Sequence, residues 1–492
     1  MKEFSREREE KDFIKLSFSS GTLVLAPSKN ELPPVLAHLA VKDERIGLYR
    51  ASASDYAGIL RICGACGIEV EDSAREYKKL PLKLHSSHTP RAHQKKALEN
   101  WKKNKGRGIV AMPTGSGKTF LAALAMASIE RSTLVVVPTI DLLIQWEKIL
   151  REFFRREVGM LGGGSHEIRD ITVATYDSAV LNMEFIGNKF GLAIYDECHH
   201  LPGEVNRKSA SMCLAPYRLG LSATPEREDD GFTVMEKLLG PLVCRIHIHE
   251  LEGSVLSPYI TRRIPVRLAP EEQERYASAR KTYVNFIRRH NIDFSAKDAW
   301  SSFIIRAVRA PGGREALKGY LEQRGIARYG KSKLAAVWKI LRNNPGERII
   351  VFTADNEAAY AMGECFMLPV ITHRTKAAER KEFLEKFRSG EYPVLLTSKV
   401  LNEGVDVPEA SIGIVVSGSG STREHVQRLG RILRAKEGKQ AILYELVSDG
   451  TSEMSVSFRR RQHRAYGNFQ YNEVPVKEIP EENPVDEKEE NS

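Results

Sequence analysis

From residue 108 onward, short continuous apolar runs alternate with amphipathic stretches, and this pattern constrains the fold more than any other feature. Runs that are apolar along their whole length are typical of parallel strands covered by helices on both faces. A first series lies at residues 108–112, 133–137, 171–174, 192–195 and 219–221. A second series lies at residues 348–352, 369–371, 394–396, 412–416 and 441–444. The pattern predicts two α/β domains with parallel sheets, over residues 86–245 and 331–460.

The segment between these domains reads differently. Residues 271–289 and 296–323 are charged and have helical periodicity, so a mainly helical insertion is expected over residues 246–330.

The first 85 residues predict a small α+β module. A hairpin is expected around Ser20-Gly21, within residues 11–27, and a helical stretch follows at residues 53–63.

Charge is distributed unevenly along the chain. Residues 473–492 hold eight carboxylates against two lysines, although the net charge of the 492 residues is +10. The body of the chain is therefore more basic than the total, which favours polyanionic partners. Residues 461–492, basic and then acidic, predict a solvated disordered tail, with a mimic of nucleic acid as the alternative.

Six cysteines in so long a chain make no disulfide framework and indicate a reducing compartment. Cys63 and Cys66 lack the second pair that a zinc ribbon requires, so buried thiols are expected. No apolar run reaches the roughly 18 residues that would span a bilayer, and the polar N-terminus lacks a signal-peptide core. We expect a cytoplasmic protein without membrane contact.

Residues 113–119, Pro-Thr-Gly-Ser-Gly-Lys-Thr, lie between the first apolar run and a helical stretch at 120–129. This is the strand-loop-helix context of a phosphate-binding loop, although Met112 stands where the strict pattern has glycine. Lys118 is expected at the β/γ-phosphates of ATP and Thr119 on Mg²⁺. The loop's expected nucleotide contacts are Thr114, Gly115, Ser116, Gly117, Lys118 and Thr119. The alternative is a chance glycine-rich turn.

Residues 196–199, Asp-Glu-Cys-His, directly follow the apolar run at 192–195. A carboxylate at a strand end is where a second Mg²⁺ contact belongs. Asp196 is the candidate metal ligand and Glu197 the candidate base that orients the attacking water. Taken alone, the tetrapeptide could be a surface turn, but the phosphate loop upstream favours catalysis.

Residues 427–434 offer the positive charge that a phosphoryl-transfer transition state requires. Helical spacing places Gln427, Arg431 and Arg434 on one face, with a solvated basic helix as the alternative. Because these residues lie in the second α/β domain, they would complete the site only when the domains close on ATP.

The motifs, their order and their two-domain partition resemble superfamily two helicases, and several resemble the archaeal branch of the XPB family. The resemblance implies that Arg91 and Gln94 read adenine, and that Gly404 and Asp406 belong to a motif facing the nucleotide sugar. It implies that residues 222–224 relay nucleotide state to the nucleic-acid groove. The strand-contacting residues that it implies are Pro138, Thr139, Thr175, Thr397 and Ser398.

Two further features are similar to that family. Arg227, Glu228 and Asp229 match an element implied to act at the strand fork, with a charged surface turn as the alternative. The insertion at 246–330 is similar to the family's thumb, and the N-terminal module to its damage-recognition domain.

The resemblance implies an ATP-dependent DNA helicase with 3'-5' polarity that acts in DNA repair and in transcription, and that works with a nuclease partner. A duplex translocase that does not separate strands is one alternative. A non-catalytic nucleic-acid-binding scaffold is another. The motifs do not read the 2'-hydroxyl, so the choice of DNA over RNA rests on the resemblance alone.

Overall fold

The computed structural model describes the chain with gaps, and the account below is restricted to these residues. They are 13–29, 31–225, 230–247, 250–251, 259–293, 299–398, 410–417, 441–455, 457 and 472–473. The chain divides into two compact units, Met1–His247 and Ile248–Ser492, and each is described by itself. In the described part, every helix is too short or too polar to cross a membrane.

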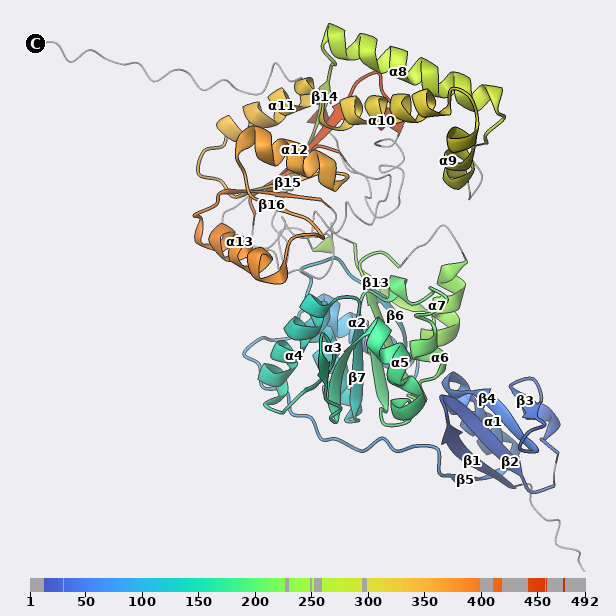
Figure 1. Ribbon diagram of the computed structural model, residues 1–492. Coiled ribbons are helices and arrows are strands. Elements are labelled where there is room, and N and C mark those ends of the chain that lie inside the picture. The colour runs from blue at the N-terminus through green and yellow to red at the C-terminus, as the bar shows by residue number, and fades with distance from the viewer. Residues whose placement is uncertain are drawn as a thin grey trace, which may run out of the picture. The chain divides into compact units, whose positions relative to one another are not determined.

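The first unit begins with a small module built on a five-stranded sheet of order β3-β4-β2-β1-β5 (Figure 1). The expected hairpin is confirmed, because β1 and β2 pair antiparallel and their turn holds Ser20 and Gly21 at positive φ. The elements are β1 (Phe13–Ser19), β2 (Thr22–Pro27), η1 (Pro34–Leu36), β3 (Ala40–Asp43), β4 (Leu48–Ser52), η2 (Ala53–Asp55), α1 (Tyr56–Cys66) and β5 (Glu69–Asp72).

This module packs against the α/β domain that follows it. Leu214 of that domain is part of the module's own apolar core, and the Ser52 hydroxyl donates to the Ser211 carbonyl at 2.9 Å. Cys63 is buried in the same core, whereas Cys66 is exposed, so the expectation of buried thiols is wrong for Cys66. The reason is the position of Cys66 in the last turn of α1, on the solvent side of the helix.

The second part of the first unit is an eight-stranded sheet of order β13-β6-β12-β11-β7-β10-β8-β9. Its strands are β6 (Arg107–Ala111), β7 (Thr133–Val137), β8 (Gly159–Gly162), β9 (Ser165–His166), β10 (Ile171–Thr175), β11 (Leu192–Tyr195), β12 (Tyr217–Ser222) and β13 (Leu242–Arg245). All neighbouring pairs are parallel except β8 with β9. The five expected strands are present, and they are buried on both faces as continuous apolar runs require.

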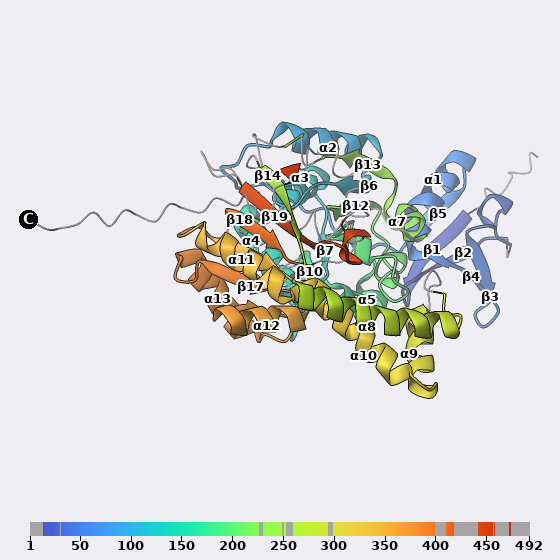
Figure 2. The ribbon, with the colours of Figure 1, turned by 90° about the horizontal axis from the view of Figure 1, so that it is seen from above.

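Helices cover both faces of this sheet (Figures 1 and 2). One face is covered by α2 (Ala92–Lys103), α3 (Lys118–Ile129) and α4 (Ile140–Phe154). The other face is covered by α5 (Tyr176–Ile186), α6 (Lys208–Ser211) and α7 (Gly231–Leu239), and a short 3-10 helix, η3 (Cys198–His200), follows β11.

The second unit contains a seven-stranded sheet of order β16-β17-β15-β18-β19-β14-β20, in which every described pair is parallel. Its strands are β14 (Tyr259–Val266), β15 (Ile349–Phe352), β16 (Val370–Ile371), β17 (Val394–Thr397), β18 (Ile412–Val415), β19 (Ala441–Ser448) and β20 (Asn472–Glu473). Its helices are α8 (Pro270–Arg289), α9 (Ala299–Arg309), α10 (Gly313–Tyr329), α11 (Lys331–Arg342), α12 (Asn356–Phe366) and α13 (Ala377–Ser389).

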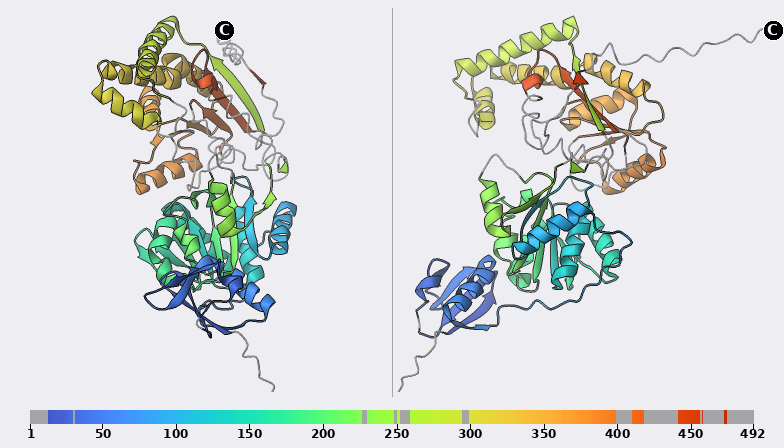
Figure 3. Two further views of the ribbon diagram at one scale, coloured as in Figure 1. Left: turned by 90° about the vertical axis from the view of Figure 1, so that its right-hand side faces the viewer. Right: turned by 180° about the vertical axis from the view of Figure 1, so that it is seen from behind.

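Helices α8, α9 and α10 pack on one another in the expected helical insertion (Figures 1 and 3). The helical stretch expected at 296–323 is interrupted, because Pro311 and Gly312 separate α9 from α10, and Gly312 has φ 78°. Their shared core is aromatic and includes Tyr283, Phe286 and Phe303.

The second sheet extends beyond residues 331–460. Strand β14 lies inside the predicted insertion, yet it pairs with β19 along its whole length. Strand β14 was not predicted because Arg262 and Arg263 interrupt its apolar run. Arg263 is nevertheless buried. Strand β20 lies inside the predicted disordered tail and pairs with β14, so this part of the tail prediction is wrong. Backbone hydrogen bonds to β14, rather than side-chain hydrophobicity, hold these residues.

Candidate active site

The phosphate loop connects β6 to α3 at the carboxyl end of the sheet. Gly115 and Gly117 have φ of 81° and 88°, a conformation that L side chains rarely adopt. A Cβ on Gly117 would stand 2.3 Å from Gln94 Nε2, so a side chain there would displace the Gln94 amide. Helix α3 begins at Lys118, and the N–H groups of its first turn are available to an anion.

The N-terminal turn of α2 holds this loop from the side. Gln94 Nε2 donates to the carbonyls of Ser116 at 3.3 Å and Gly117 at 3.2 Å. Gln94 Oε1 accepts from the Arg91 N–H at 3.0 Å, which closes the turn at the start of α2. His93, which the sequence analysis missed, places Nε2 2.9 Å from the Ser116 carbonyl. Arg91 and Gln94 therefore lie beside the loop, and Gln94 braces it.

Lys118 and Glu197 form a buried ion pair across the site. Lys118 Nζ lies 2.8 Å from Glu197 Oε1, and each side chain is only 11% exposed. Burial alone would raise the pKa of Glu197, but the Lys118 ammonium and His199 hold that pKa below its ordinary range. Burial likewise opposes the charge on Lys118, yet Glu197 raises the pKa of Lys118 above its ordinary value. Both groups are therefore charged at neutral pH.

Asp196 stands at the carboxyl end of β11 and is held from several directions. Its Oδ1 accepts from the Glu197 N–H at 3.0 Å, and its Oδ2 accepts from Trp146 Nε1 at 2.8 Å. The Tyr176 hydroxyl donates to the Asp196 carbonyl at 3.3 Å. Burial and the neighbouring Glu197 carboxylate raise the pKa of Asp196 above its ordinary value. Trp146 and Tyr176 were missed because each reads as an ordinary core residue in an amphipathic helix.

Glu197 adopts a left-handed backbone conformation, with φ 44° and ψ 52°. Such a conformation is uncommon for a residue with a long side chain and is typical of functional sites. Its Oε2 is buried and lies 3.4 Å from His199 Nδ1. His199 Nδ1 is closer to Ser222 Oγ, at 3.1 Å, which links the acidic turn to the end of β12.

The predicted strand-contacting residues of the first unit lie at adjacent strand ends. Thr139 follows β7 and caps α4, because its Oγ1 accepts from the Leu142 N–H at 3.3 Å. Thr175 ends β10 and caps α5 by accepting from the Ser178 N–H at 3.3 Å. Since β7 and β10 are paired, the two caps are brought to one edge, with Pro138 beside them.

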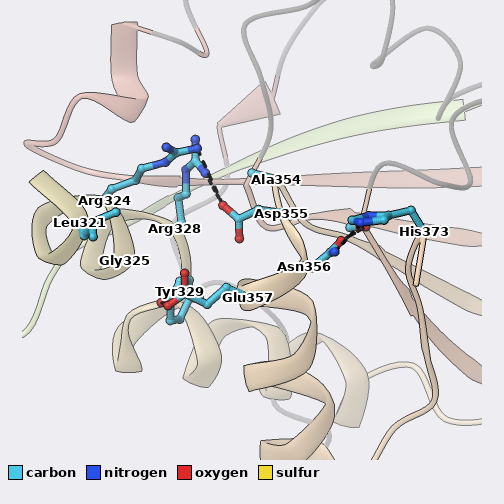
Figure 4. A pocket seen from close by; sticks show the side chains of 11 residues that line it. Leu321, Arg324, Gly325, Arg328, Tyr329, Ala354, Asp355, Asn356, Glu357 and His373 are labelled. Carbon is cyan, nitrogen blue, oxygen red and sulfur yellow. Dashed lines mark hydrogen bonds and ion pairs between the residues drawn. The ribbon is translucent and has the colours of Figure 1, made fainter. Parts of the chain in front are cut away.

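Among the described residues, the corresponding edge of the second sheet borders a cavity. Ser398 follows β17, its hydroxyl donates to Asn356 Oδ1 at 2.7 Å, and the preceding Thr397 is fully buried. A cavity of about 720 Å³ opens at this edge (Figure 4). It is lined by Leu321, Arg324, Gly325, Arg328, Tyr329, Ala354, Asp355, Asn356, Glu357, His373 and Ser398.

Two arginines of α10 gather around one carboxylate in this cavity. Arg328 forms an ion pair with Asp355, and Arg324 approaches the same Oδ2 at 3.9 Å (Figure 4). Asp355 also caps α12, because its Oδ1 accepts from the Ala358 N–H at 3.1 Å. His373 Nδ1 lies 3.1 Å from Asn356 Nδ2 on the opposite side. Arg324, Arg328 and His373 were not identified from the sequence.

Several predicted site residues lie outside the described residues. They are Arg227, Glu228, Asp229, Gly404, Asp406, Gln427, Arg431 and Arg434. Thr119 is described and occupies the first turn of α3, directly after Lys118.

The two parallel sheets, with a phosphate loop and an acidic turn at the carboxyl edge of the first, define a helicase-type ATPase. Three family descriptions match successive segments. Residues 16–74 match the xeroderma pigmentosum group B helicase damage recognition domain, and residues 87–227 match the type III restriction enzyme res subunit. Residues 332–490 match the ERCC3/RAD25/XPB C-terminal helicase.

Relatives along most of the chain agree with these matches. The DNA 3'-5' translocase XPB2 of Sulfurisphaera tokodaii is 40% identical over 419 residues, covering 85% of this chain and 95% of that protein. The DNA 3'-5' helicase XPB of Mycobacterium tuberculosis is 30% identical over 406 residues, covering 80% of this chain and 66% of that protein. The chain belongs to the XPB family of DNA helicases.

Solved structures support the fold. The Saccharomyces cerevisiae protein Dbp5 bound to RNA and ADP BeF3 has a TM-score of 0.56 at 14% identity, covering 79% of this chain and 91% of that one. The Pyrococcus furiosus Hef helicase domain has a TM-score of 0.53 at 18% identity, covering 76% of this chain and 98% of that one.

Proposed function

We propose that this chain hydrolyses ATP at the phosphate loop and uses the energy to move 3'-5' along DNA and open it. The observation that carries the proposal is the buried pair of Lys118 and Glu197, held between the phosphate loop and Asp196. Two opposite charges buried together cost desolvation energy, and such sites persist where chemistry needs them. The named activities of the XPB relatives supply the direction and the DNA substrate.

Mg²⁺ fits the donor set of the site. Thr119 and Asp196 supply a hydroxyl and a carboxylate, the hard oxygen ligands that Mg²⁺ prefers alongside phosphates. Each Asp196 oxygen accepts one protein hydrogen bond and keeps a further lone pair. When bound, the ion would neutralise charge on the phosphate oxygens.

The residues of the chain then divide the remaining tasks. Lys118 exchanges Glu197 for the β/γ-phosphates, which frees the Glu197 carboxylate to orient and deprotonate the attacking water. The Oε2 of Glu197, which faces His199 rather than Lys118, is the oxygen proposed to meet that water. Arg91 and Gln94 hold the adenine ring of ATP beside the loop.

In this proposal, residues of the second unit stabilise the transition state and bind the sugar. Arg431 and Arg434, with Gln427, stabilise the transferring phosphoryl group, and Gly404 and Asp406 hold the sugar. The strand contacts are Pro138, Thr139 and Thr175 in the first unit and Thr397, Ser398 and the cavity arginines in the second. The basic balance of the chain outside its acidic tail supports contact with phosphates.

The choice between unwinding and translocation turns on Arg227, Glu228 and Asp229. A translocase without strand separation is the second candidate, because the Sulfurisphaera relative is named a translocase and the Mycobacterium relative a helicase. An Arg227→Ala/Asp229→Ala double variant should lose fork unwinding and keep movement on duplex DNA, measured by triplex displacement. Unchanged unwinding in the variant would remove these residues from the fork, whereas a wild-type protein that moves on duplex DNA without opening the fork would favour the translocase.

We also propose action in DNA repair with a separate nuclease partner, in the compartment that holds the DNA. A yeast relative, 29% identical over 418 residues, is named a subunit of the general transcription and DNA repair factor IIH. The chain covers 44% of that relative, so a shared assembly is part of the proposal. Co-purification from the native cell should recover a nuclease activity, and recovery of none would remove this part.

The central test is the steady-state ATPase rate with a forked DNA duplex, with a matched RNA duplex and with neither. DNA should stimulate hydrolysis and RNA should not. Stimulation by RNA alone would overturn the substrate. Stimulation by neither duplex would point to a missing partner or to the non-catalytic scaffold.

A further inference from the structure

Asp196 is held by two helices, α4 and α5, whose N-cap residues, Thr139 and Thr175, are proposed strand contacts. Helix α4 starts behind Thr139 and carries Trp146, and Trp146 Nε1 donates to Asp196 Oδ2 at 2.8 Å. Helix α5 starts behind Thr175, and its first residue, Tyr176, donates its hydroxyl to the Asp196 carbonyl at 3.3 Å. These helices cover opposite faces of the sheet, so Asp196 is held from both sides (Figure 1).

These contacts leave little freedom to the carboxylate. Trp146, Tyr176 and Asp196 are exposed by only 1%, 3% and 5%, so water does not compete for the hydrogen bonds. An indole N–H can only donate, so Asp196 Oδ2 must accept the hydrogen bond from Trp146. This contact fixes one orientation of the carboxylate. The second oxygen is fixed by the Glu197 N–H.

The path from strand contact to carboxylate is short and stiff. Trp146 lies seven residues beyond Thr139, two turns along the same helix face. Leu143, Trp146, Leu150 and Phe154 are all buried, so α4 moves as one body when its first turn shifts. Tyr176 directly follows Thr175 in the sequence. A displacement of Thr175 therefore moves the Tyr176 hydroxyl, which contacts the Asp196 carbonyl.

We propose that Trp146 and Tyr176 are positioning residues that couple strand contact at Thr139 and Thr175 to the orientation of Asp196 toward Mg²⁺. The inference rests on the proposed function and deepens it, because it assigns the route by which DNA accelerates hydrolysis. Partners that orient a metal ligand typically affect metal affinity by about 10- to 100-fold when removed. The two aromatic residues touch neither nucleotide nor strand, and they act through Asp196.

The chain offers a matched control for Trp146. Trp101 is equally buried in the same domain and also donates its indole N–H at 2.8 Å, but to the Arg218 carbonyl. Trp146→Phe and Trp101→Phe therefore remove the same group and leave similar space. The measurement is the affinity of a fluorescent ADP analogue with Mg²⁺ and with EDTA, together with the ratio of DNA-stimulated to basal ATPase rate.

Trp146→Phe should weaken Mg²⁺-dependent binding on the order of tenfold, leave binding in EDTA unchanged, and lower the stimulation ratio. Trp101→Phe should change neither readout. If the two variants gave the same Mg²⁺-dependent affinity and the same stimulation ratio, while DNA still stimulated the wild-type protein, the coupling would be overturned and the proposed function would stand. A wild-type protein without Mg²⁺-dependent, DNA-stimulated hydrolysis would overturn the proposed function itself, and the coupling with it.

A second pair of variants keeps the test valid if Trp146→Phe does not fold. Tyr176→Phe removes one oxygen atom, and Tyr195→Phe is its control, because the buried Tyr195 hydroxyl donates to the Ser209 carbonyl at 2.9 Å. Tyr176→Phe should lower the stimulation ratio and Tyr195→Phe should not. Thr139→Ala should cost less stimulation in the Trp146→Phe background than in the wild type, and additive losses would contradict a shared route.

Discussion

The carboxyl edges of the two sheets share a parallel strand arrangement but differ in how deeply their charged side chains are buried. In the first unit the charged groups at this edge, Lys118 and Glu197, are buried against each other and braced by neighbouring side chains. In the second unit Arg324 and Arg328 border an open cavity around Asp355, and that carboxylate is 34% exposed. One topology thus supports a closed chemical site and an open charged surface.

The difference shows that the burial of a charged side chain determines which task it suits. Electrostatic interactions in a low-dielectric site are strong and little affected by salt, which suits a reaction whose transition state is charged. Charges near solvent are weakened by salt and exchange partners readily, which suits a surface that must grip and release a polyanion. We therefore expect substitutions of the buried Lys118 and Glu197 to change rates, and substitutions of the cavity arginines to change salt-dependent binding.

Glu197→Gln should give the largest effect. It keeps the shape of the side chain but removes the base and the charge, so ATP hydrolysis should fall by at least about 100-fold. Nucleotide affinity, measured by fluorescence, should persist, because the phosphate loop and Lys118 are unchanged. Turnover within a few-fold of wild type would remove Glu197 from the catalytic role.

Arg328→Ala should have an intermediate effect on DNA binding. We expect affinity for forked DNA to fall by roughly three- to tenfold, and the slope of log affinity against log salt to fall by about one. Nucleotide affinity should not change. Arg275→Ala is the control, because Arg275 lies in the same helical insertion and pairs with Glu322 outside this cavity. Equal losses from both variants would show that the cavity has no special role.

Asp355→Asn should give the smallest effect, and in the opposite direction. Asparagine caps a helix as well as aspartate, so the stability of α12 should hold while the arginines lose their competing carboxylate. DNA affinity should rise by about two- to threefold at low salt. Asp355→Ala should show the same gain but lose about 1 kcal/mol of stability with the cap, measured by denaturant unfolding. A loss of DNA affinity in Asp355→Asn would mean that the ion pair organises the binding surface.

The same contrast separates what could be predicted from the sequence from what could not. The phosphate loop and the acidic turn are local patterns that follow buried strands, and parallel strands bring their carboxyl ends to one edge. Lys118 and Glu197 could therefore be assigned to one site without a structure, although their ion pair was not predicted. The indole of Trp146 reaches Asp196 only through tertiary packing, and in the sequence it cannot be distinguished from a core residue of α4.

The cavity of the second unit was hidden for a similar reason. Arg324 and Arg328 lie four residues apart on a charged helix, a pattern that ordinary solvated surfaces share. Only the packing of α10 beside α12 brings them to Asp355. The prediction was strongest where chemistry follows one strand, and weakest where distant helices converge.

The place of β14 has a consequence for synthesis of the chain. It lies between β19 and β20, yet most of the second unit's sequence separates Tyr259 from its partner Ala441. During translation β14 therefore emerges long before either neighbour exists. Until then it is an unpaired template for other strands, and such exposed edges promote misassembly. We expect the second unit to complete its fold late, once β19 has left the ribosome, whereas the first unit can fold while the rest is still being made.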